Sequence, residues 1–562
     1  MIARSAFPMA VILLISSARA DDPPAKPDSP LVKLLKRGNL PEDRLATIAE
    51  MVARRGTAAD RGYVVGRCAG ADALPATVRH RVLNAVAEVA RTSQAEVDGA
   101  EGKVAALLAS TEAADRRDGA EVAGALKLKS LASTLKAMVA EGPVGEKATA
   151  ADALAAIVDR QALSALSEPS RPLDVRMPSV AALARLDADA ASKLAAALLK
   201  DAPPTADVAP LVSAFLTLKE GPAKLGAAIE AAGLPADPAK LALRAVYALG
   251  HAEDALVDPL KKAAGLDAEV KPTTPAEMDR LVADVAAKGN PERGERVFRR
   301  AELNCMGCHA LAGAAGGVGP ELSAVGQVSP VDYLVNSIML PDQAIKEQYH
   351  TLVVATADGQ VFQGIVVDKD DAKITLKDAT GATRVVPVSA VEEQKEGGSL
   401  MPKGLVNFLT RAEFVDLVRF LSELGKPGAY AIHSTPTIQR WRLAKSGETE
   451  AATWRPAYAL STGLVPLAEF AAVGDPELRL KGEIEVTAAG PLAIRVGDAT
   501  GLKAILDGSP LDLGAEATPA LAVGRHTLEL AVDIRARGGR PLKVEVARPA
   551  GGSAEYAVVG GR

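Results

Sequence analysis

The sequence contains little cysteine and few aromatic side chains. Its 562 residues include three cysteines, and phenylalanine, tryptophan and tyrosine together make up 3% of the chain. So few cysteines exclude the disulfide framework that stabilises many small secreted proteins. The apolar share of 48% comes largely from alanine, which favours packed helices over a β protein with a large aromatic core.

Strong charge and long apolar runs are also missing from the sequence. The net charge of -5 is small for this length, and no dense run of lysine and arginine occurs. We therefore expect neither nucleic acid nor an anionic membrane surface as a partner. No segment is apolar over the length that a transmembrane helix needs. The length exceeds that of a single hydrophobic core and predicts a multidomain chain.

Residues 1–20 have the order of features found in a secretory signal peptide. Arg4 precedes an apolar run over residues 6–15, and the Ala-Arg-Ala sequence at 18–20 has the spacing that signal peptidase recognises. We predict cleavage near Ala20 and an exported protein, periplasmic or at the cell surface. An uncleaved N-terminal helix is the alternative.

Residues 22–287 show a helical period that is interrupted by short Gly, Pro and Asp turns. One phrase recurs about every 32 residues, a period typical of stacked helix pairs. Its copies are VAALARL from 180, VSAFLTL from 212, LRAVYAL from 243 and a fainter LNAVAEV from 83. This pattern predicts an all-α helical-repeat solenoid, a type of fold that usually binds or scaffolds. The phrases resemble HEAT-type repeats, although the period is short for them, and a non-repetitive Ala-rich bundle is the alternative.

Two later segments alternate between apolar and polar residues with a period of two. Residues 349–394 predict four or five short strands with Asp-Gly, Asp-Asp and Thr-Gly turns between them. Residues 475–562 predict a small antiparallel β-sandwich bounded by Gly, Pro and Asp. The Pro-containing stretch between residues 427 and 474 is expected to be a linker.

Two helices are expected to enclose the first of these strand-rich segments. In the earlier helix, which opens near Gly289, Gly294 and Phe298 lie four residues apart on one face. The later helix begins after Thr410, an N-cap residue that is followed three positions on by Glu413. It ends near residue 425, where a glycine forms the C-terminal cap.

Two of the three cysteines, Cys305 and Cys308, come directly before His309. Thiols at this spacing can add to the two vinyl groups of a heme, while the histidine that follows binds the iron. A zinc site would need a second pair of ligands, and no other C-x-x-C or H-x-x-x-H occurs. A thioredoxin-like dithiol would follow a strand rather than a helix. We therefore predict one covalent heme c per chain, and we expect the remaining Cys68 to be a buried apolar residue.

Met401 is the favoured sixth ligand of the heme iron, opposite His309. It lies in the loop SLMPKG, where a thioether can be held rigidly before the last helix. Met339 occurs in an apolar helical segment and is expected in the core, while Met306 and His350 are weaker candidates. A closed His/Met site transfers electrons, whereas an open sixth position binds or activates small molecules.

Residues 289–426 resemble a cytochrome c domain, and more narrowly the planctomycete-type heme-binding domain. The matching pieces are GERVF, CMGCH, GGVGPELSAVG, YLVNSIMLPDQAI, TADGQVFQGIV, SLMPKGL and EFVDLVRFLSEL. The resemblance implies a mainly α domain in which the strand-rich stretch 349–394 is an insert. That insert is expected to shield the heme edge, to form a docking face, or to be a structural elaboration only.

The resemblance also assigns roles to individual residues. It implies covalent heme at Cys305 and Cys308, with His309 and Met401 as the axial ligands. It further implies that the carbonyl of Pro320 accepts a hydrogen bond from the imidazole of His309 and so orients the ring. The two enclosing helices are expected to pack through Gly294 and Phe298 against Phe420 and Leu421.

Together these features predict an exported monoheme cytochrome c that carries electrons and has no substrate of its own. The expected partner is a redox protein such as an exported dehydrogenase, within a larger redox or polysaccharide-degrading assembly. The C-terminal unit resembles protective-antigen-type β-sandwiches, which implies carbohydrate as a second partner. The alternatives are a heme enzyme or gas sensor with a labile sixth ligand, and a scaffold or glycan-binding protein.

Overall fold

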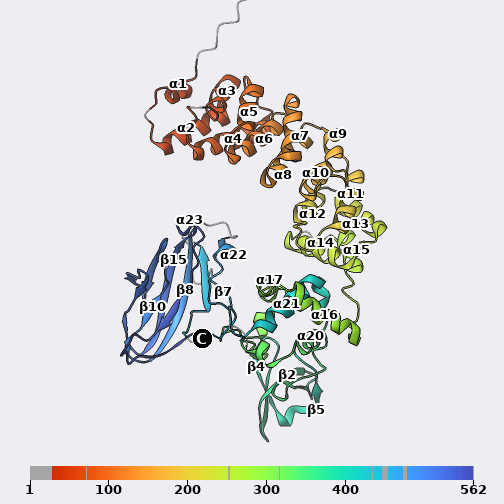
Figure 1. The fold of residues 1–562 in the computed structure, drawn as a ribbon, viewed down its shortest axis with the longest axis vertical. Coiled ribbons are helices and arrows are strands. Elements are labelled where there is room, and N and C mark those ends of the chain that lie inside the picture. Colours follow the sequence, from red (N-terminus) through yellow and green to blue (C-terminus); the bar gives the residue numbers. More distant parts are fainter. Residues whose placement is uncertain are drawn as a thin grey trace, which may run out of the picture. The chain divides into compact units, whose positions relative to one another are not determined.

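The computed structural model describes residues 28–38, 40–70, 72–250, 253–300, 302–314, 317–432, 435–445, 454–471 and 477–560. The predicted signal peptide, residues 1–20, lies outside these residues. Within them, no helix is long and apolar enough to cross a membrane. The chain has the expected multidomain order, with helices first and antiparallel sheets towards the C-terminus (Figure 1).

The chain forms two compact units. The first comprises Met1–Asp201, Asp207–Ala232 and Ala245–Leu256, and the second comprises Ala202–Ala206, Gly233–Arg244 and Val257–Arg562. Parts of the predicted helical region, Gly233–Arg244 and the residues from Val257 onwards, therefore group with the segments that follow it. Helical periodicity shows that a helix has an apolar face, but it does not show which core that face joins.

Helices joined by short turns make up most of the first unit. They are α1 (Pro30–Lys36), α2 (Glu42–Arg55), α3 (Ala58–Gly66), α4 (Ala76–Ser93), α5 (Ala100–Leu108), α6 (Ala113–Ala125), η1 (Lys129–Leu131), α7 (Ala132–Glu141), α8 (Val144–Ala156), α9 (Arg160–Leu166), α10 (Leu173–Leu183), α11 (Ala188–Asp201), α12 (Ala209–Leu216) and α13 (Gly221–Ala232). Local sequence sets several of these boundaries. Thr57, for example, opens α3 by a capping box with Asp60.

Alternate helices of this unit pack side by side. Helices α2, α4, α6, α8, α10 and α12 each contact the next member of this series, as Figure 1 shows for its first members. The copies of the recurring phrase begin in α4, α10 and α12 of this series and in α14 (Ala236–Ala248). A second series includes α3 with α5, and α11 with α13.

Ion pairs connect successive helices of the first series. A basic side chain of one helix meets an acidic side chain of the next in the pairs Arg79–Asp115, Arg116–Glu146 and Lys147–Asp174. Asp115 and Arg116 are adjacent on α6, and Glu146 and Lys147 are adjacent on α8. Each of these two helices therefore forms an ion pair with the helix before it and with the helix after it. Because several of these charges are buried, loss of one partner would leave the other uncompensated.

The helices of the second unit include the first part of α14, α15 (Asp254–Ala264) from Val257 onwards, and α16 (Pro275–Lys288). Helix α16 packs against α21 (Arg411–Glu423), and its Leu281 and Val285 belong to the same core as Phe420. Helix α16 thus shares a hydrophobic core with the segment that follows residue 287.

Helices α17 (Pro291–Phe298) and α21 flank residues 299–410 and pack tightly on one another. A Cβ atom on Gly294 would lie 2.0 Å from the carbonyl oxygen of Asp416, so only glycine fits there. The ring centroids of Phe298 and Phe420 are 5.8 Å apart. Thr410 and Glu413 form the expected capping box at the start of α21. Between these helices lie α18 (Cys305–Cys308), α19 (Val325–Val328), α20 (Val331–Met339), η2 (Glu347–Tyr349) and η4 (Leu405–Phe408).

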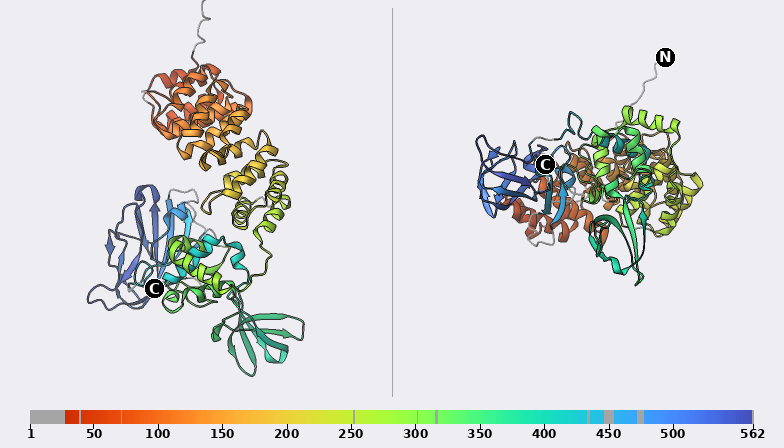
Figure 2. Two further views of the ribbon diagram at one scale, coloured as in Figure 1. Left: turned by 45° about the vertical axis from the view of Figure 1, so that its right-hand side comes forward. Right: turned by 90° about the horizontal axis from the view of Figure 1, so that it is seen from below.

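The strand-rich insert folds as one antiparallel sheet, visible in Figure 2. Its strands are β1 (Thr351–Thr356), β2 (Val361–Lys369), β3 (Lys373–Lys377), β4 (Thr383–Pro387) and β5 (Val391–Gly397), in the order β4-β3-β2-β1-β5. Its own small core contains Val354, Ile374, Leu376 and Val386. The predicted Asp-Gly and Thr-Gly turns contain Gly359 and Gly381, which both have a positive φ.

Two antiparallel sheets near the C-terminus share one hydrophobic core. The larger sheet contains β6 (Arg440–Lys445), β7 (Arg455–Tyr458), β8 (Glu477–Ala488), β11 (Leu502–Leu506), β12 (Ser509–Leu511), β15 (Gly524–Asp533) and β17 (Glu555–Val558). The smaller sheet contains β10 (Ala493–Arg495), β13 (Glu516–Ala517) and β16 (Glu545–Ala547).

The stretch 427–474, predicted to be a linker, contributes to this fold. Strand β6 pairs with β8, and Trp441 on β6 is fully buried. The sheet therefore begins before residue 475. The prolines of this stretch suggested a linker, but Pro436 lies before β6 and Pro456 lies in β7, which is an edge strand and therefore tolerates proline.

Candidate cofactor-binding site

The C-x-x-C-H sequence forms a single tight turn of helix. Asn304 starts it in the left-handed conformation, with a φ of 51°. Helix α18 then spans the two cysteines, and the backbone N–H of His309 donates to the carbonyl of Cys305 at 2.8 Å. Residues three apart lie on the same side of a helix, so the turn presents both thiols together. Both cysteines are partly buried.

The imidazole of His309 is held from two directions. Its Nδ1 lies 2.9 Å from the carbonyl oxygen of Pro320, which is the hydrogen bond that the resemblance implied. A carbonyl only accepts, so Nδ1 carries the proton and Nε2 is the ring nitrogen with a lone pair for a metal. Gly319 lies against the ring, where a Cβ atom would be 2.8 Å from Cε1. Burial lowers the pKa of His309, while its bond to Pro320 opposes that shift, so the neutral, ligating form is favoured.

One cavity of about 300 Å³ brings the predicted ligands together. Cys305, Cys308, His309 and Met401 all line it. Most of the remaining wall is apolar and includes Phe298, Leu334, Ile338, Leu405, Leu409, Leu417 and Leu421. Ile365 of β2 also lines the cavity, so the β insert forms part of its wall.

The other candidate axial ligands lie elsewhere. Among the described residues that line the cavity, neither Met306, Met339 nor His350 is found. Met339 ends α20 and packs against the helical core, as its apolar segment predicts. His350 is exposed at the start of β1.

The loop around Met401 is fixed by polar contacts on its N-terminal side. The backbone N–H of Met401 donates to Ser399 Oγ at 3.1 Å, and the N–H of Ser399 donates to Asp342 Oδ1 at 2.7 Å. Lys403 forms an ion pair with the same carboxylate at 2.5 Å. The hydrogen bonds from Lys403 and from Ser399 hold the pKa of Asp342 below its ordinary value, so the carboxylate stays charged and keeps both contacts.

The thiols of this site differ from those of a redox-active dithiol. Burial raises the pKa of Cys305 to about 11 and raises that of Cys308 as well. Reactive dithiols depend instead on a lowered pKa. Within the described part of the chain, no group of three or more His, Cys, Asp or Glu side chains is placed to hold a metal ion. The geometry thus supports neither a zinc site nor a redox-active dithiol at Cys305 and Cys308.

The polar groups that hold the Met401 loop were not found by sequence reasoning. Asp342 stands in an ordinary turn, and nothing in its local sequence indicates a partner near residue 399. Its only signal is its place within the YLVNSIMLPDQAI stretch that carries the resemblance.

Comparisons with known proteins find no family model that matches this chain and no matching curated protein.

Proposed function

We propose that this protein is an exported monoheme c-type cytochrome that transfers electrons. The observation that carries the proposal is the meeting of Cys305, Cys308, His309 and Met401 on one apolar cavity. Cys308 and Met401 are far apart in sequence, and neither the C-x-x-C-H motif nor composition requires a methionine at that cavity.

The residues present fit a heme in their chemistry. Two adjacent thiols are suited to form the thioether links, and His309 presents Nε2 while Pro320 holds Nδ1. The thioether of Met401 lies on the wall of the same cavity. A bound heme would supply a one-electron couple, whose potential a methionine ligand raises. Most of the cavity wall is apolar, as a heme requires, and Gly319 leaves room for the ring of His309.

The proposal extends to the rest of the chain. We assign the first unit to a HEAT-like helical-repeat solenoid, because its alternate helices contact one another in series and carry the recurring phrase. We assign the C-terminal sheets to a β-sandwich module. An exported dehydrogenase is the proposed electron donor, since a His/Met site has no open position for a substrate of its own.

Methionine exchange tests the proposed ligand set. The purified wild-type protein should show the visible spectrum of covalent heme c and the charge-transfer band of methionine-ligated ferric heme. Met401→Leu should abolish that band and allow the reduced protein to bind carbon monoxide, while the covalent heme remains. Met339→Leu is the matched control, because Met339 packs against the same core without lining the cavity. A wild-type protein that lacks covalent heme would refute the proposal, and unchanged ligation in Met401→Leu would refute the role of Met401.

A further inference from the structure

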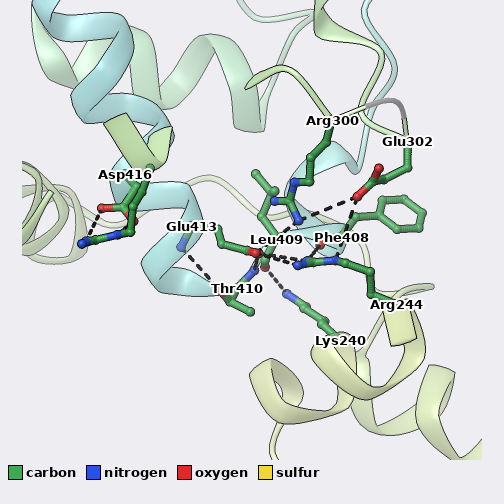
Figure 3. Close-up of polar contacts among 10 residues, drawn as sticks. Lys240, Arg244, Arg300, Glu302, Phe408, Leu409, Thr410, Glu413 and Asp416 are labelled. Carbon is green, nitrogen blue, oxygen red and sulfur yellow. Dashed lines mark hydrogen bonds and ion pairs between the residues drawn. The ribbon is translucent and has the colours of Figure 1, made fainter. Parts of the chain in front are cut away.

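Side chains from α14 hold the chain segment that follows Met401 (Figure 3). Lys240 Nζ donates to the carbonyl oxygen of Leu409 at 2.7 Å, and Arg244 Nη2 donates to that of Phe408 at 3.4 Å. Both carbonyls lie just before the N-cap of α21, so no helical N–H satisfies them. The two cations supply the missing donors.

Further contacts hold the neighbouring backbone. The side-chain amide of Asn407 donates to the carbonyls of Leu266 and Ala268 at 3.0 and 2.9 Å. The backbone N–H of Arg411 donates to Asp237 Oδ2 at 3.0 Å. The whole stretch from η4 to the start of α21 is therefore attached to residues 237–244 and 266–268 of the same unit.

One carboxylate connects this stretch with the cysteine side of the cavity. Arg244 donates twice to Glu413, at 2.7 and 3.0 Å, and Arg300 forms an ion pair with Glu413 at 3.1 Å. Figure 3 shows both guanidinium groups directed at this carboxylate. Arg300 lies shortly before Cys305, and Glu413 also accepts from the backbone N–H of Thr410 at 2.9 Å.

The held stretch reaches the cavity itself. Leu405 and Leu409 line the cavity together with Met401, and η4 follows Met401 after a single glycine turn at Gly404, whose φ is 79°. On its other side, Met401 is fixed through Ser399 to Asp342. The loop is thus attached at both ends, and a shift of η4 would move the thioether along the cavity wall.

We propose that Lys240 and Arg244 are positioning residues for Met401, because they hold the segment 405–413 in the place that keeps the thioether at the cavity. This inference rests on the proposed function, since it concerns the ligand that Met401 would supply. It makes the first part of α14, which the sequence placed in a separate helical region, a structural part of the cofactor site.

Leucine in place of Arg244 tests the inference. Arg244→Leu should keep the full amount of covalent heme, because Cys305, Cys308 and His309 are held by other contacts. The charge-transfer band of the methionine-ligated ferric heme should weaken, and the affinity of the reduced protein for carbon monoxide should rise about tenfold, the effect of losing one hydrogen bond to a charged group.

Arg160→Leu is the matched control. Arg160 donates to a carboxylate, Asp187, and to the backbone carbonyl of Leu186, which are the same kinds of contact in the first unit. Arg160→Leu should therefore leave the band and the carbon monoxide affinity at wild-type values. A merely structural role of Arg244 would shift the unfolding midpoint of Arg244→Leu without changing either ligation readout.

Two milder variants keep the inference testable if Arg244→Leu does not accumulate. Lys240→Met removes the donor to Leu409 alone, and Arg244→Lys keeps the charge but not the two-pronged contact with Glu413. Each should weaken the band in part. Wild-type ligation in both, at full heme content, would overturn the inference while the proposed function stands. If instead Met401→Leu leaves the wild-type spectrum unchanged, the proposed ligand set fails first.

Discussion

Replacing Gly294 with alanine would place a methyl group where α21 already has a backbone carbonyl. The Cβ atom would lie 2.0 Å from the oxygen of Asp416 and 2.7 Å from Cβ of Phe420. The carbonyl cannot rotate away, because it belongs to a helix, so α17 and α21 must separate by roughly 1 Å. A gap of this size forfeits about a quarter to a half of the dispersion energy across the contact. We expect Gly294→Ala to lower the free energy of unfolding by about 3 kcal/mol, the upper end of the usual cost of overpacking.

Gly102→Ala provides the matched control for this prediction. Gly102 lies in α5, and a Cβ atom there would meet no atom within 4 Å. Alanine is the better helix former, so this variant should gain up to about 1 kcal/mol. Hydrogen exchange of the α17 and α21 amides, followed by mass spectrometry, measures the effect where the helices meet. Wild-type exchange of these amides in Gly294→Ala would refute the close approach as the reason for the glycine.

Two further substitutions test other parts of the second unit. Gly319→Ala would press a methyl group against the imidazole of His309, so we expect less covalent heme in the purified protein, measured by its absorbance per chain. Burial raises the pKa of the Glu295 carboxyl group, although hydrogen bonds from Ser461 oppose this shift. As the pH rises, Glu295 therefore keeps its proton in the folded chain after it has lost it in the unfolded chain. The contribution of Glu295 to the free energy of unfolding is therefore greatest below the ordinary glutamate pKa and declines above it. In urea unfolding, Glu295→Gln should therefore gain stability over wild type as the pH rises, and a constant difference would contradict this.

Short-range patterns in the sequence predicted much of the local structure. Thr410 and Glu413 predicted the start of α21, and the Asp-Gly turn at Gly359 predicted the hairpin between β1 and β2. Both signals depend on residues that contact one another within a few positions. The contact of Gly294 and Phe298 with Phe420 was also expected, but only through the resemblance to cytochromes c.

Contacts between distant segments were not predictable in the same way. Trp441 gave no sign that its strand would pair with β8, because the intervening prolines suggested a linker. Likewise, Leu281 and Val285 form an ordinary apolar helix face, which fits a repeat helix as well as the core that α16 joins. Periodicity identifies a buried face, but the partner of that face depends on the whole fold.

The candidate site also combines local contacts, which the sequence can predict, with contacts between distant segments, which it cannot. On the cysteine side, the turn at Cys305 and the carbonyl of Pro320 that orients His309 come from one short stretch of chain. The methionine side depends on Asp342 before it and on Lys240 and Arg244 from far earlier in the sequence. Perturbations of these remote residues should therefore loosen Met401 before they disturb His309. In the proposed heme site, the methionine ligand would then be the one through which the rest of the second unit influences the heme.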